Sequence, residues 1–279
     1  MKDQIKYFVD CEYLKTQLEN PQTVIIDCRF QLSDPDWGEA AYQEGHIPGA
    51  YYLHLDRDLS SLIQRHGGRH PLPNMEKMAQ KFSQLGIVKN KTQVVVYDSS
   101  RFAFASRVWW LLRYLGHNQV ALLDGGWQGW LDNSFPLESA IPQAQPGNFP
   151  LGSLPDWLVD IENVKAAKDK ESIIVVDSRD RDRYEGKREP IDPIAGSVPG
   201  AVNSPWQQVS EENGYLKSVA EQKQLWQNYQ NAAEIIVYCG SGVTACVNLL
   251  SLEISGFNNT KLYAGGWSDW CSYLLEKRG

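Results

Sequence analysis

The sequence of 279 residues lacks any apolar run close to the ~18–20 residues that a membrane-spanning helix needs. Its first residues, MKDQIKYFVDCEYL, include acidic side chains and no apolar secretory segment. Five cysteines, an odd number, have the spacing of neither a disulfide framework nor a zinc site. Basic residues are not in excess, since the formal net charge is −7. We therefore expect a cytoplasmic protein with no membrane or nucleic-acid partner, no metal and no organic cofactor.

Four short segments occur twice, in the same order and about half a chain apart. The matched pairs are 24–29 with 174–179, 45–50 with 196–201, 94–98 with 235–239, and 123–130 with 263–270. A repeat this long indicates a duplicated domain. The stretch FPLESAIPQAQPGNFPLGSLP between the copies is rich in Pro, Gly, Ser and Gln, as linkers are. The predicted organisation is a first domain over 1–137, a linker over 138–157 and a second domain over 158–279.

Each half of the sequence alternates between strand and helix patterns. Runs of nearly pure Val and Ile predict strands buried on both faces, as parallel strands are. We expect strands near 23–28, 93–97, 119–123, 172–177, 234–238 and 260–263, and helices near 10–19, 74–85, 103–115, 160–168, 219–228 and 244–255. This alternation predicts an α/β fold in which helices cover a parallel sheet and ligands bind at the carboxyl ends of the strands.

One strand end carries the most informative residues of the chain. Cys239 follows the apolar run 235–238 and opens the loop Cys-Gly-Ser-Gly-Val-Thr-Ala, after which an apolar helical pattern begins. Backbone N–H groups in such a loop, together with the helix N-terminus, favour an anion such as a thiolate. We interpret Cys239 as a nucleophile, with a buried structural cysteine as the alternative. A cysteine phosphatase is disfavoured, because Ala245 stands where that chemistry needs an arginine for the phosphate.

With the motifs HIPGA, RVWWLLRYLGH, LLDGGW and RYEG…EPIDPIAG, the chain resembles the two-domain rhodanese-type sulfurtransferases over nearly its whole length. The loop CGSGVTAC is similar to that of the 3-mercaptopyruvate sulfurtransferases in this family. The resemblance implies two tandem domains, each a parallel five-stranded sheet flanked by helices, with catalysis in the second. Asp98 replaces the cysteine in the first domain and no glycine occurs over 99–103, so we expect that copy to be inactive.

The resemblance implies a sulfur-transfer cycle at Cys239. The thiolate attacks the sulfur of a small anionic donor, forms a persulfide, and passes the sulfur to a thiol or cyanide acceptor. The expected donor is 3-mercaptopyruvate and the alternative is thiosulfate, because the thiosulfate-specific members carry charged residues where this loop has Gly240 and Ser241. The loop positions expected to hold the substrate are Gly240, Gly242, Val243 and Thr244.

Positively charged residues outside the loop are also implied. By the resemblance, Arg183 holds the negative charge of the donor, and the alternative is a surface arginine in a charged run. Several mercaptopyruvate enzymes have a second arginine directly after a Glu-Pro pair, but Ile191 occupies that place here. Arg188 is a candidate substitute.

The family further suggests a proton relay of Asp56, His70 and Ser241, in which Asp56 and His70 come from the first domain. The alternative, that Asp56 and His70 are surface loop residues, has equal weight. Because a serine loses a proton with difficulty, His70 need only orient substrate or water.

The remaining repeated residues suggest architecture. Asp27 with Arg29, and Asp177 with Arg179, recur in both halves and predict an ion pair at a strand end. The GGWxxW repeats predict core and turn positions, and Cys246 is expected in the core rather than as a resolving thiol. A non-catalytic rhodanese module is a further alternative, which the complete cysteine loop disfavours.

Overall fold

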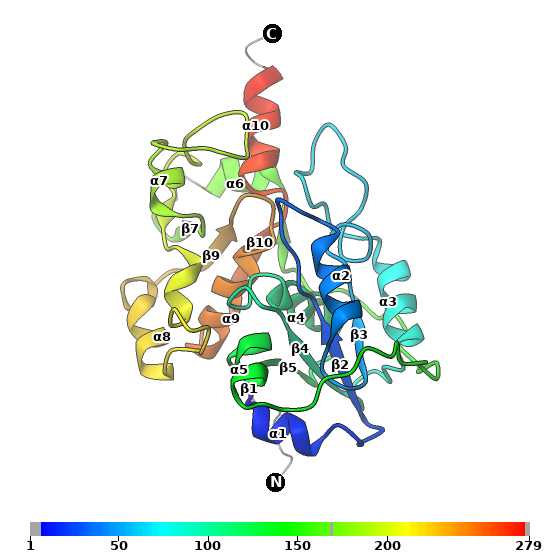
Figure 1. Cartoon of the computed structure of the whole chain (residues 1–279). Coiled ribbons are helices and arrows are strands. Elements are labelled where there is room, and N and C mark those ends of the chain that lie inside the picture. The colour runs from blue at the N-terminus through cyan, green and yellow to red at the C-terminus, as the bar shows by residue number, and fades with distance from the viewer. Residues whose placement is uncertain (1–6, 168–169, 277–279) are drawn as a thin grey trace. The chain divides into compact units, whose positions relative to one another are not determined.

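The computed structural model describes residues 7–167 and 170–276, which form two compact units (Figure 1). The first unit holds the chain up to Ser60 together with Pro73–Pro155 and Ser210–Leu216. The second holds Ser61–Leu72, Asp156–Val209 and the chain from Lys217 onward. Each unit contains its own parallel five-stranded sheet, which confirms the expected fold class. None of the described helices is long and apolar enough to cross a membrane.

The sheet of the first unit has the strand order β1-β5-β4-β2-β3, and all its neighbouring strands pair in parallel. Its strands are β1 (Phe8–Val9), β2 (Thr23–Asp27), β3 (Ala50–Tyr52), β4 (Gln93–Tyr97) and β5 (Val120–Leu123). The flanking helices are α1 (Cys11–Thr16), α2 (Trp37–Glu44), α3 (Met75–Gln84), α4 (Ala105–Tyr114) and α5 (Gly126–Asp132). The central strands consist almost wholly of buried Val and Ile, as their sequence pattern predicts.

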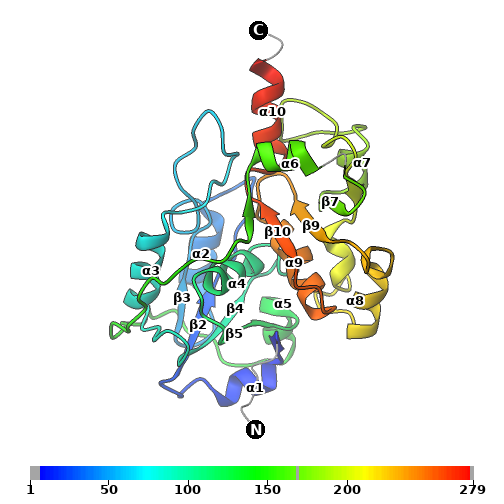
Figure 2. The ribbon, with the colours of Figure 1, turned by 180° about the vertical axis from the view of Figure 1, so that it is seen from behind.

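The second unit repeats this arrangement with the order β6-β10-β9-β7-β8, again parallel (Figure 2). Its strands are β6 (Leu158–Val159), β7 (Ile173–Asp177), β8 (Val202–Asn203), β9 (Glu234–Tyr238) and β10 (Thr260–Tyr263). Its helices are α6 (Ile161–Ala167), α7 (Arg181–Tyr184), α8 (Val219–Leu225), α9 (Ala245–Ile254) and α10 (Gly266–Glu276), with 3₁₀ turns at Trp206–Val209 and Gln227–Tyr229. Because β9 is central, its carboxyl end places Cys239 in the middle of the unit's functional edge.

A buried ion pair lies at the end of one strand in each unit, which confirms that prediction. The side chains of Asp27 and Arg29 approach to 2.7 Å and those of Asp177 and Arg179 to 2.6 Å. All four side chains are nearly excluded from solvent, so each charge is compensated inside the protein. Tyr97 adds a hydroxyl bond of 2.7 Å to Asp27.

The GGWxxW repeats provide core and turn residues, as expected, but they also begin the helices α5 and α10. Their second glycines, Gly126 and Gly266, have φ of +54° and +61°. A Cβ on either one would lie 2.5 Å from a backbone oxygen, so the turn requires glycine. Trp130, Trp267 and Trp270 are buried in the cores beneath these helices.

Two segments belong to a different unit from the one that their position in the sequence suggests. Residues 61–72, called the strap below, are part of the second unit, and residues 210–216 are part of the first. In the first unit the backbone N–H of Leu216 donates to Asp124 (2.8 Å), and Arg101 Nη2 donates to the carbonyl of Ser210 (2.7 Å). The domain boundaries drawn from the sequence stay a prediction, and they contain no hint of this exchange.

Candidate active site

Backbone hydrogen bonds join the loop between β9 and α9 to the start of α10. The carbonyl of Cys239 accepts the Trp267 N–H at 2.8 Å, and the carbonyl of Gly240 accepts the Ser268 N–H at 2.9 Å. Gly242 has φ of +72°, and a Cβ there would lie 2.3 Å from the carbonyl oxygen of Ala264. The glycine is therefore needed both for the backbone conformation and for the close approach of the loop to the backbone at Ala264.

Cys239 itself is only 2% exposed. The side chain is therefore covered by its surroundings and is not open to solvent. Val243 is also buried and Thr244, directly before α9, is half-buried. Cys246 is fully buried and its thiol donates to the carbonyl of Gly242 at 3.5 Å, which confirms its expected place in the core.

His70 and Ser241 are brought together in the second unit. The His70 Nδ1 lies 2.7 Å from the Ser241 Oγ, and both side chains are buried. The strap supplies His70, so the expectation that this histidine comes from the first domain is wrong: the contact forms within the second unit although the residues are far apart in sequence. Asp56 belongs to the first unit, where its backbone N–H donates to His54 Nδ1 at 3.1 Å and its side chain is exposed. The three-residue relay stays a prediction.

Two guanidinium groups face the residue that follows the cysteine. A Cβ built on Gly240 would lie 2.9 Å from Arg69 Nη2, 3.6 Å from Arg183 Nη2 and 3.8 Å from Arg183 Nη1. Arg183 was expected near the loop from the resemblance, whereas Arg69 was missed. Its signal in the sequence is weak, because it is one cation in the polar stretch QRHGGRHP and is remote from the loop in the chain.

Buried carboxylates fix the orientation of these arginines. Arg183 bonds Glu189 at 2.7 Å and Asp192 at 3.1 Å, and Arg69 Nη1 pairs with the same Asp192. Glu189 also bonds Arg179 at 3.1 Å, which joins the site to the strand-end ion pair. Burial alone would raise the pKa of Glu189, but its bonds from Arg183 and backbone N–H groups bring that pKa below its ordinary value. Burial dominates at Asp192 and raises its pKa.

The positions considered for a second arginine do not provide one. Ile191 is exposed and contributes its backbone N–H to Glu189 at 3.1 Å. Arg188 has a side chain that is 56% exposed and lies 3.5 Å from Asp180. The atoms nearest to the Cβ position of Gly240 come from Arg69 and Arg183 and not from these two residues.

In the first unit, a side chain of the loop itself accepts the backbone N–H groups of the corresponding loop. The Asp98 carboxylate accepts four backbone N–H groups at 2.8–3.1 Å, from Ser100, Phe102, Phe104 and Ala105. This loop closes around the carboxylate without glycine, because Arg101 and Phe102 adopt φ of +56° and +72°. Burial raises the pKa of Asp98, and the four N–H bonds oppose that rise.

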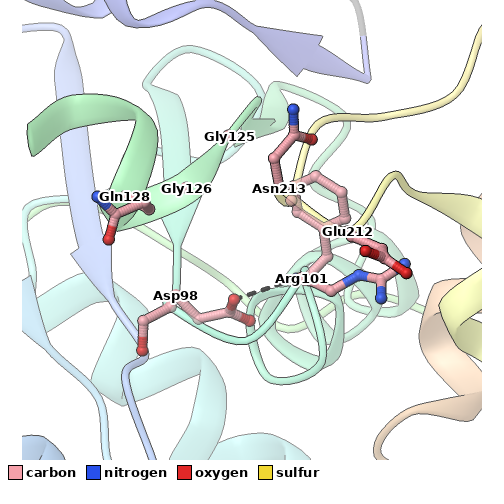
Figure 3. Close-up of a pocket in the computed structure, with 10 residues that line it drawn as sticks. Asp98, Arg101, Gly125, Gly126, Gln128, Glu212 and Asn213 are labelled. Atoms are coloured by element: carbon pink, nitrogen blue, oxygen red, sulfur yellow. Dashed lines mark hydrogen bonds between the residues drawn. The ribbon is translucent and has the colours of Figure 1, made fainter. Parts of the chain in front are cut away.

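A cavity of about 230 Å³ lies beside Asp98 in the first unit (Figure 3). Its wall includes Arg101, Gln128, Glu212 and Asn213, and the turn at Gly125–Gly126 closes one side. The Arg101 guanidinium is held by Ser210 at 2.7–2.9 Å. No nucleophilic thiol lines this cavity, since Asp98 takes the position that Cys239 has in the second unit.

Within the residues that the structure describes, no cluster of three or more His, Cys, Asp or Glu side chains could hold a metal ion. All five cysteines are among these residues, and none of them forms a disulfide. Burial raises the pKa of Cys11 and of Cys271 to about 12. Those two thiols are therefore poor nucleophiles.

The repeated fold and the cysteine loop define a class of protein. The family model described as the rhodanese-like domain matches residues 10–133 and 160–273, so the chain belongs to the rhodanese-like family and contains two copies of its domain. A Pseudomonas aeruginosa protein, whose name places it among the 3-mercaptopyruvate sulfurtransferases, is 38% identical over 267 residues, which cover 93% of each chain.

Two further proteins are similar to this chain over most of its length. A Mycobacterium tuberculosis protein, named as the thiosulfate sulfurtransferase SseB, is 33% identical over 253 residues, covering 89% of this chain and 87% of that one. The crystal structure of SseA from Escherichia coli, described as a 3-mercaptopyruvate sulfotransferase with the rhodanese fold, matches with a TM-score of 0.82 and 32% identity. That match covers 94% of this chain and 99% of SseA.

Proposed function

We propose that this protein transfers sulfur from 3-mercaptopyruvate, through a persulfide on Cys239, to a thiol or to cyanide. The observation that carries the proposal is the position of Cys239 at the end of β9, with the guanidinium groups of Arg69 and Arg183 close to the next residue. A nucleophilic thiol beside two cations suits a small anionic sulfur donor. The similarity to proteins named as 3-mercaptopyruvate sulfurtransferases supports that choice of donor.

The first half-reaction breaks the carbon–sulfur bond of the donor. The Cys239 thiolate attacks the donor sulfur and forms a sulfur–sulfur bond. The electron pair of the broken bond passes to the remaining three-carbon unit, which leaves as the enolate of pyruvate. A proton then converts the enolate to pyruvate. His70 and Ser241, 2.7 Å apart, form a hydrogen-bonded pair suited to orienting the donor or delivering that proton. Asp56 is kept in the proposal as a third member of this relay.

In the second half-reaction an acceptor thiolate attacks the outer sulfur of the persulfide. Its sulfur–sulfur bond breaks, the acceptor leaves as a persulfide and Cys239 is released as a thiolate. Cyanide reacts at the same atom and leaves as thiocyanate. We assign Gly240, Gly242, Val243 and Thr244 to the cradle that holds the sulfur during this cycle.

The first unit supports the idea that the loop cradles an anion. There the residue at the end of β4, Asp98, places a carboxylate among four backbone N–H groups. The same strand–loop–helix arrangement therefore binds negative charge within this chain. A persulfide anion on Cys239 has the corresponding place in the second unit.

Thiosulfate is the second candidate donor, and Arg69 is the observation that favours it. The uncharged pair Gly240–Ser241 suggests a loop without cations for a doubly charged donor. Two guanidinium groups from outside the loop supply such cations. The relative named as a thiosulfate sulfurtransferase agrees with this alternative.

We further propose a cytoplasmic location, because no two of the five cysteines form a disulfide and the persulfide cycle needs thiols in the reduced state. The proposed partners are the anionic donor and the acceptor; the net charge of −7 disfavours nucleic acid. A phosphatase activity lacks support, since the buried Ala245 offers no guanidinium for a phosphate.

The test is a mass measurement of the intact protein after incubation with each donor. We expect 3-mercaptopyruvate to add one sulfur atom to the wild type and to Cys246→Ser, and to add none to Cys239→Ser. Cys246→Ser is the matched control, because it removes a thiol next to the same loop. Steady-state kcat/KM values for the two donors, measured with the same acceptor, decide between them. A wild type that gains no sulfur from either donor would refute the proposal.

A further inference from the structure

The first unit repeats the backbone frame that surrounds Cys239 in the second unit. In each unit the residue at the end of the central strand, Asp98 or Cys239, lies against the second glycine of a GGW turn. A Cβ on Gly126 would lie 2.5 Å from the carbonyl oxygen of Asp98. A Cβ on Gly266 would lie 2.5 Å from the carbonyl oxygen of Cys239. The first unit has therefore kept the frame of a ligand site at its strand ends, although it lacks the thiol.

A covering segment completes this frame in each unit. Residues 210–216, called the cover segment below, belong to the first unit as the strap belongs to the second. Gly68 of the strap has φ of +81°, and its Cβ position lies 2.3 Å from the carbonyl oxygen of Gly265. Gly214 of the cover segment has φ of +87°, and its Cβ position lies 3.8 Å from the carbonyl oxygen of Gly125. The cover segment is thus the structural counterpart of the strap.

The cavity of the first unit is lined by the cover segment and by the loop that follows β4. Its volume of about 230 Å³ is below the ~300–1,000 Å³ of pockets for drug-sized ligands, so it suits a smaller molecule. Figure 3 shows Arg101, Glu212 and Asn213 grouped on one side of the cavity, apart from Asp98 and Gln128. A ligand in this cavity therefore meets several charged and polar side chains at once.

Two of these side chains offer a ligand opposite charges. The Asp98 carboxylate is compensated within its own loop, where it accepts four backbone N–H groups. The Arg101 guanidinium is held by Ser210 at 2.7–2.9 Å, which fixes the position of its positive charge. Glu212 is exposed, and its side chain has no hydrogen-bond or ion-pair partner among the described residues. The cavity thus has one fixed cation and one carboxylate that is open to a ligand.

The amide of Asn213 adds a hydrogen-bond donor to the same side of the cavity. Its Oδ1 accepts the backbone N–H of Tyr215 at 3.3 Å, which orients the amide and leaves Nδ2 as its other polar end. An amide N–H on the same side as a guanidinium suits a carboxylate ligand (Figure 3). The carboxylate of Glu212 suits an ammonium group in the same way.

We propose that this cavity binds a small α-amino acid in its zwitterionic form. The ligand carboxylate lies at Arg101 and Asn213, and the ligand ammonium group lies at Glu212. An α-amino acid has both charges on one carbon atom, whereas a simple amine or a simple carboxylate matches only one side of the site. The proposal goes beyond the proposed function and is independent of it, because amino acid binding in the first unit requires no sulfur transfer at Cys239.

The experiment measures binding of each common L-amino acid except cysteine to the full-length protein by isothermal titration calorimetry. Cysteine is left out because its thiol can accept sulfur. We expect at least one amino acid to bind with a Kd below about 1 mM. The matching amine and the matching acid, which for alanine are ethylamine and propionate, should each bind at least about tenfold more weakly. That factor is the usual worth of a charge-assisted hydrogen bond.

Variants of the cover segment place the binding at the cavity. Glu212→Gln and Asn213→Asp should each weaken binding at least about tenfold. The aspartate keeps an oxygen for the Tyr215 N–H but offers the ligand carboxylate no donor. Glu211→Gln is the matched control, because Glu211 is the exposed neighbour of Glu212 and is not among the described residues that line the cavity. It should bind within about twofold of wild type.

Four results would each overturn the proposal. The first is that no amino acid binds with a Kd below about 1 mM. The second is that Glu212→Gln binds the amino acid as tightly as wild type, and the third is that Glu211→Gln loses as much affinity as Glu212→Gln. The fourth is that the amine or the acid alone binds as tightly as the amino acid.

Discussion

The substitution Gly68→Ala adds a single methyl group, which should displace the strap from the active loop. Its φ is +81°, and a Cβ there would lie 2.3 Å from the carbonyl oxygen of Gly265. The neighbouring Gly67 has φ of +98°, yet the nearest atom to its Cβ position is 4.0 Å away in Pro71. The variants Gly68→Ala and Gly67→Ala therefore share the backbone strain of a left-handed residue, and only Gly68→Ala adds a clash.

The magnitude follows from that clash. Ordinary van der Waals contact begins at 3.4 Å, so the strap or the turn at Gly265 has to move by roughly 1 Å. Arg69 and His70 follow Gly68 directly in the chain and move with it. A misplacement of about 1 Å in a substrate-positioning group costs on the order of 100-fold in rate. The strain common to both variants costs about 1–2 kcal/mol of stability.

The assay is the loading rate of Cys239 with 3-mercaptopyruvate, measured beside the unfolding temperature and the far-UV circular dichroism of each variant. We expect Gly67→Ala to lose stability but to load within about threefold of wild type, because no atom obstructs its Cβ. Gly68→Ala should keep its secondary structure and load at least about tenfold more slowly. Equal loading by the two variants would refute the view that the strap positions site residues through this contact.

Three further predictions concern the first unit. Asp98→Cys in the Cys239→Ser background should gain no sulfur from donor, because Arg101, the one arginine among the described residues that line the cavity, is held by Ser210; a persulfide at position 98 in the mass spectrum would contradict this. Asp27→Asn should lower the free energy of unfolding by about 3 kcal/mol or more in urea titrations, since it leaves Arg29 buried without its partner; a loss below about 1 kcal/mol would argue against it. Burial lowers the pKa of His117 to about 4 from an ordinary 6.5, so the unfolded chain binds a proton first as pH falls. Stability should therefore decline from pH 6.5 to pH 4 by about 3 kcal/mol from this residue, and an equally steep decline in His117→Gln would refute the assignment.

The elements that the sequence predicted are those with a strong local pattern. The Val and Ile runs of β2, β4, β7 and β9 are central strands, and such runs have few alternative structures. The edge strands β1, β3, β6 and β8 have two or three residues, which is too short for any periodicity to show. Helix α2 was missed because its segment WGEAAYQE has a glycine near its start and few apolar side chains.

The site was predictable where a motif is continuous in the chain and not where the fold assembles it. Cys239 and Ser241 lie in one loop, so the local pattern indicated the nucleophile Cys239, and the family resemblance suggested the role of Ser241. Arg69 is brought to that loop by the strap, and no local pattern in a polar segment rich in glycine indicates its destination. The ion pairs at Asp27 and Asp177 were predictable from a local pattern, because the sequence Asp-x-Arg occurs twice at a strand end.

The two units differ in the residue that follows their central strand. Both have a parallel sheet, a buried ion pair at a strand end and a loop that leads from a central strand into a helix. In the first unit the Asp98 carboxylate accepts hydrogen bonds from the N–H groups of that loop. We therefore expect no site for an external sulfur there. In the second unit a thiol has the same position, and the strap adds Arg69 and His70 to the loop. The fold thus supplies the same loop twice, whereas the thiol and the two guanidinium groups beside it, to which we assign the nucleophile and the donor-binding roles, lie in the second unit.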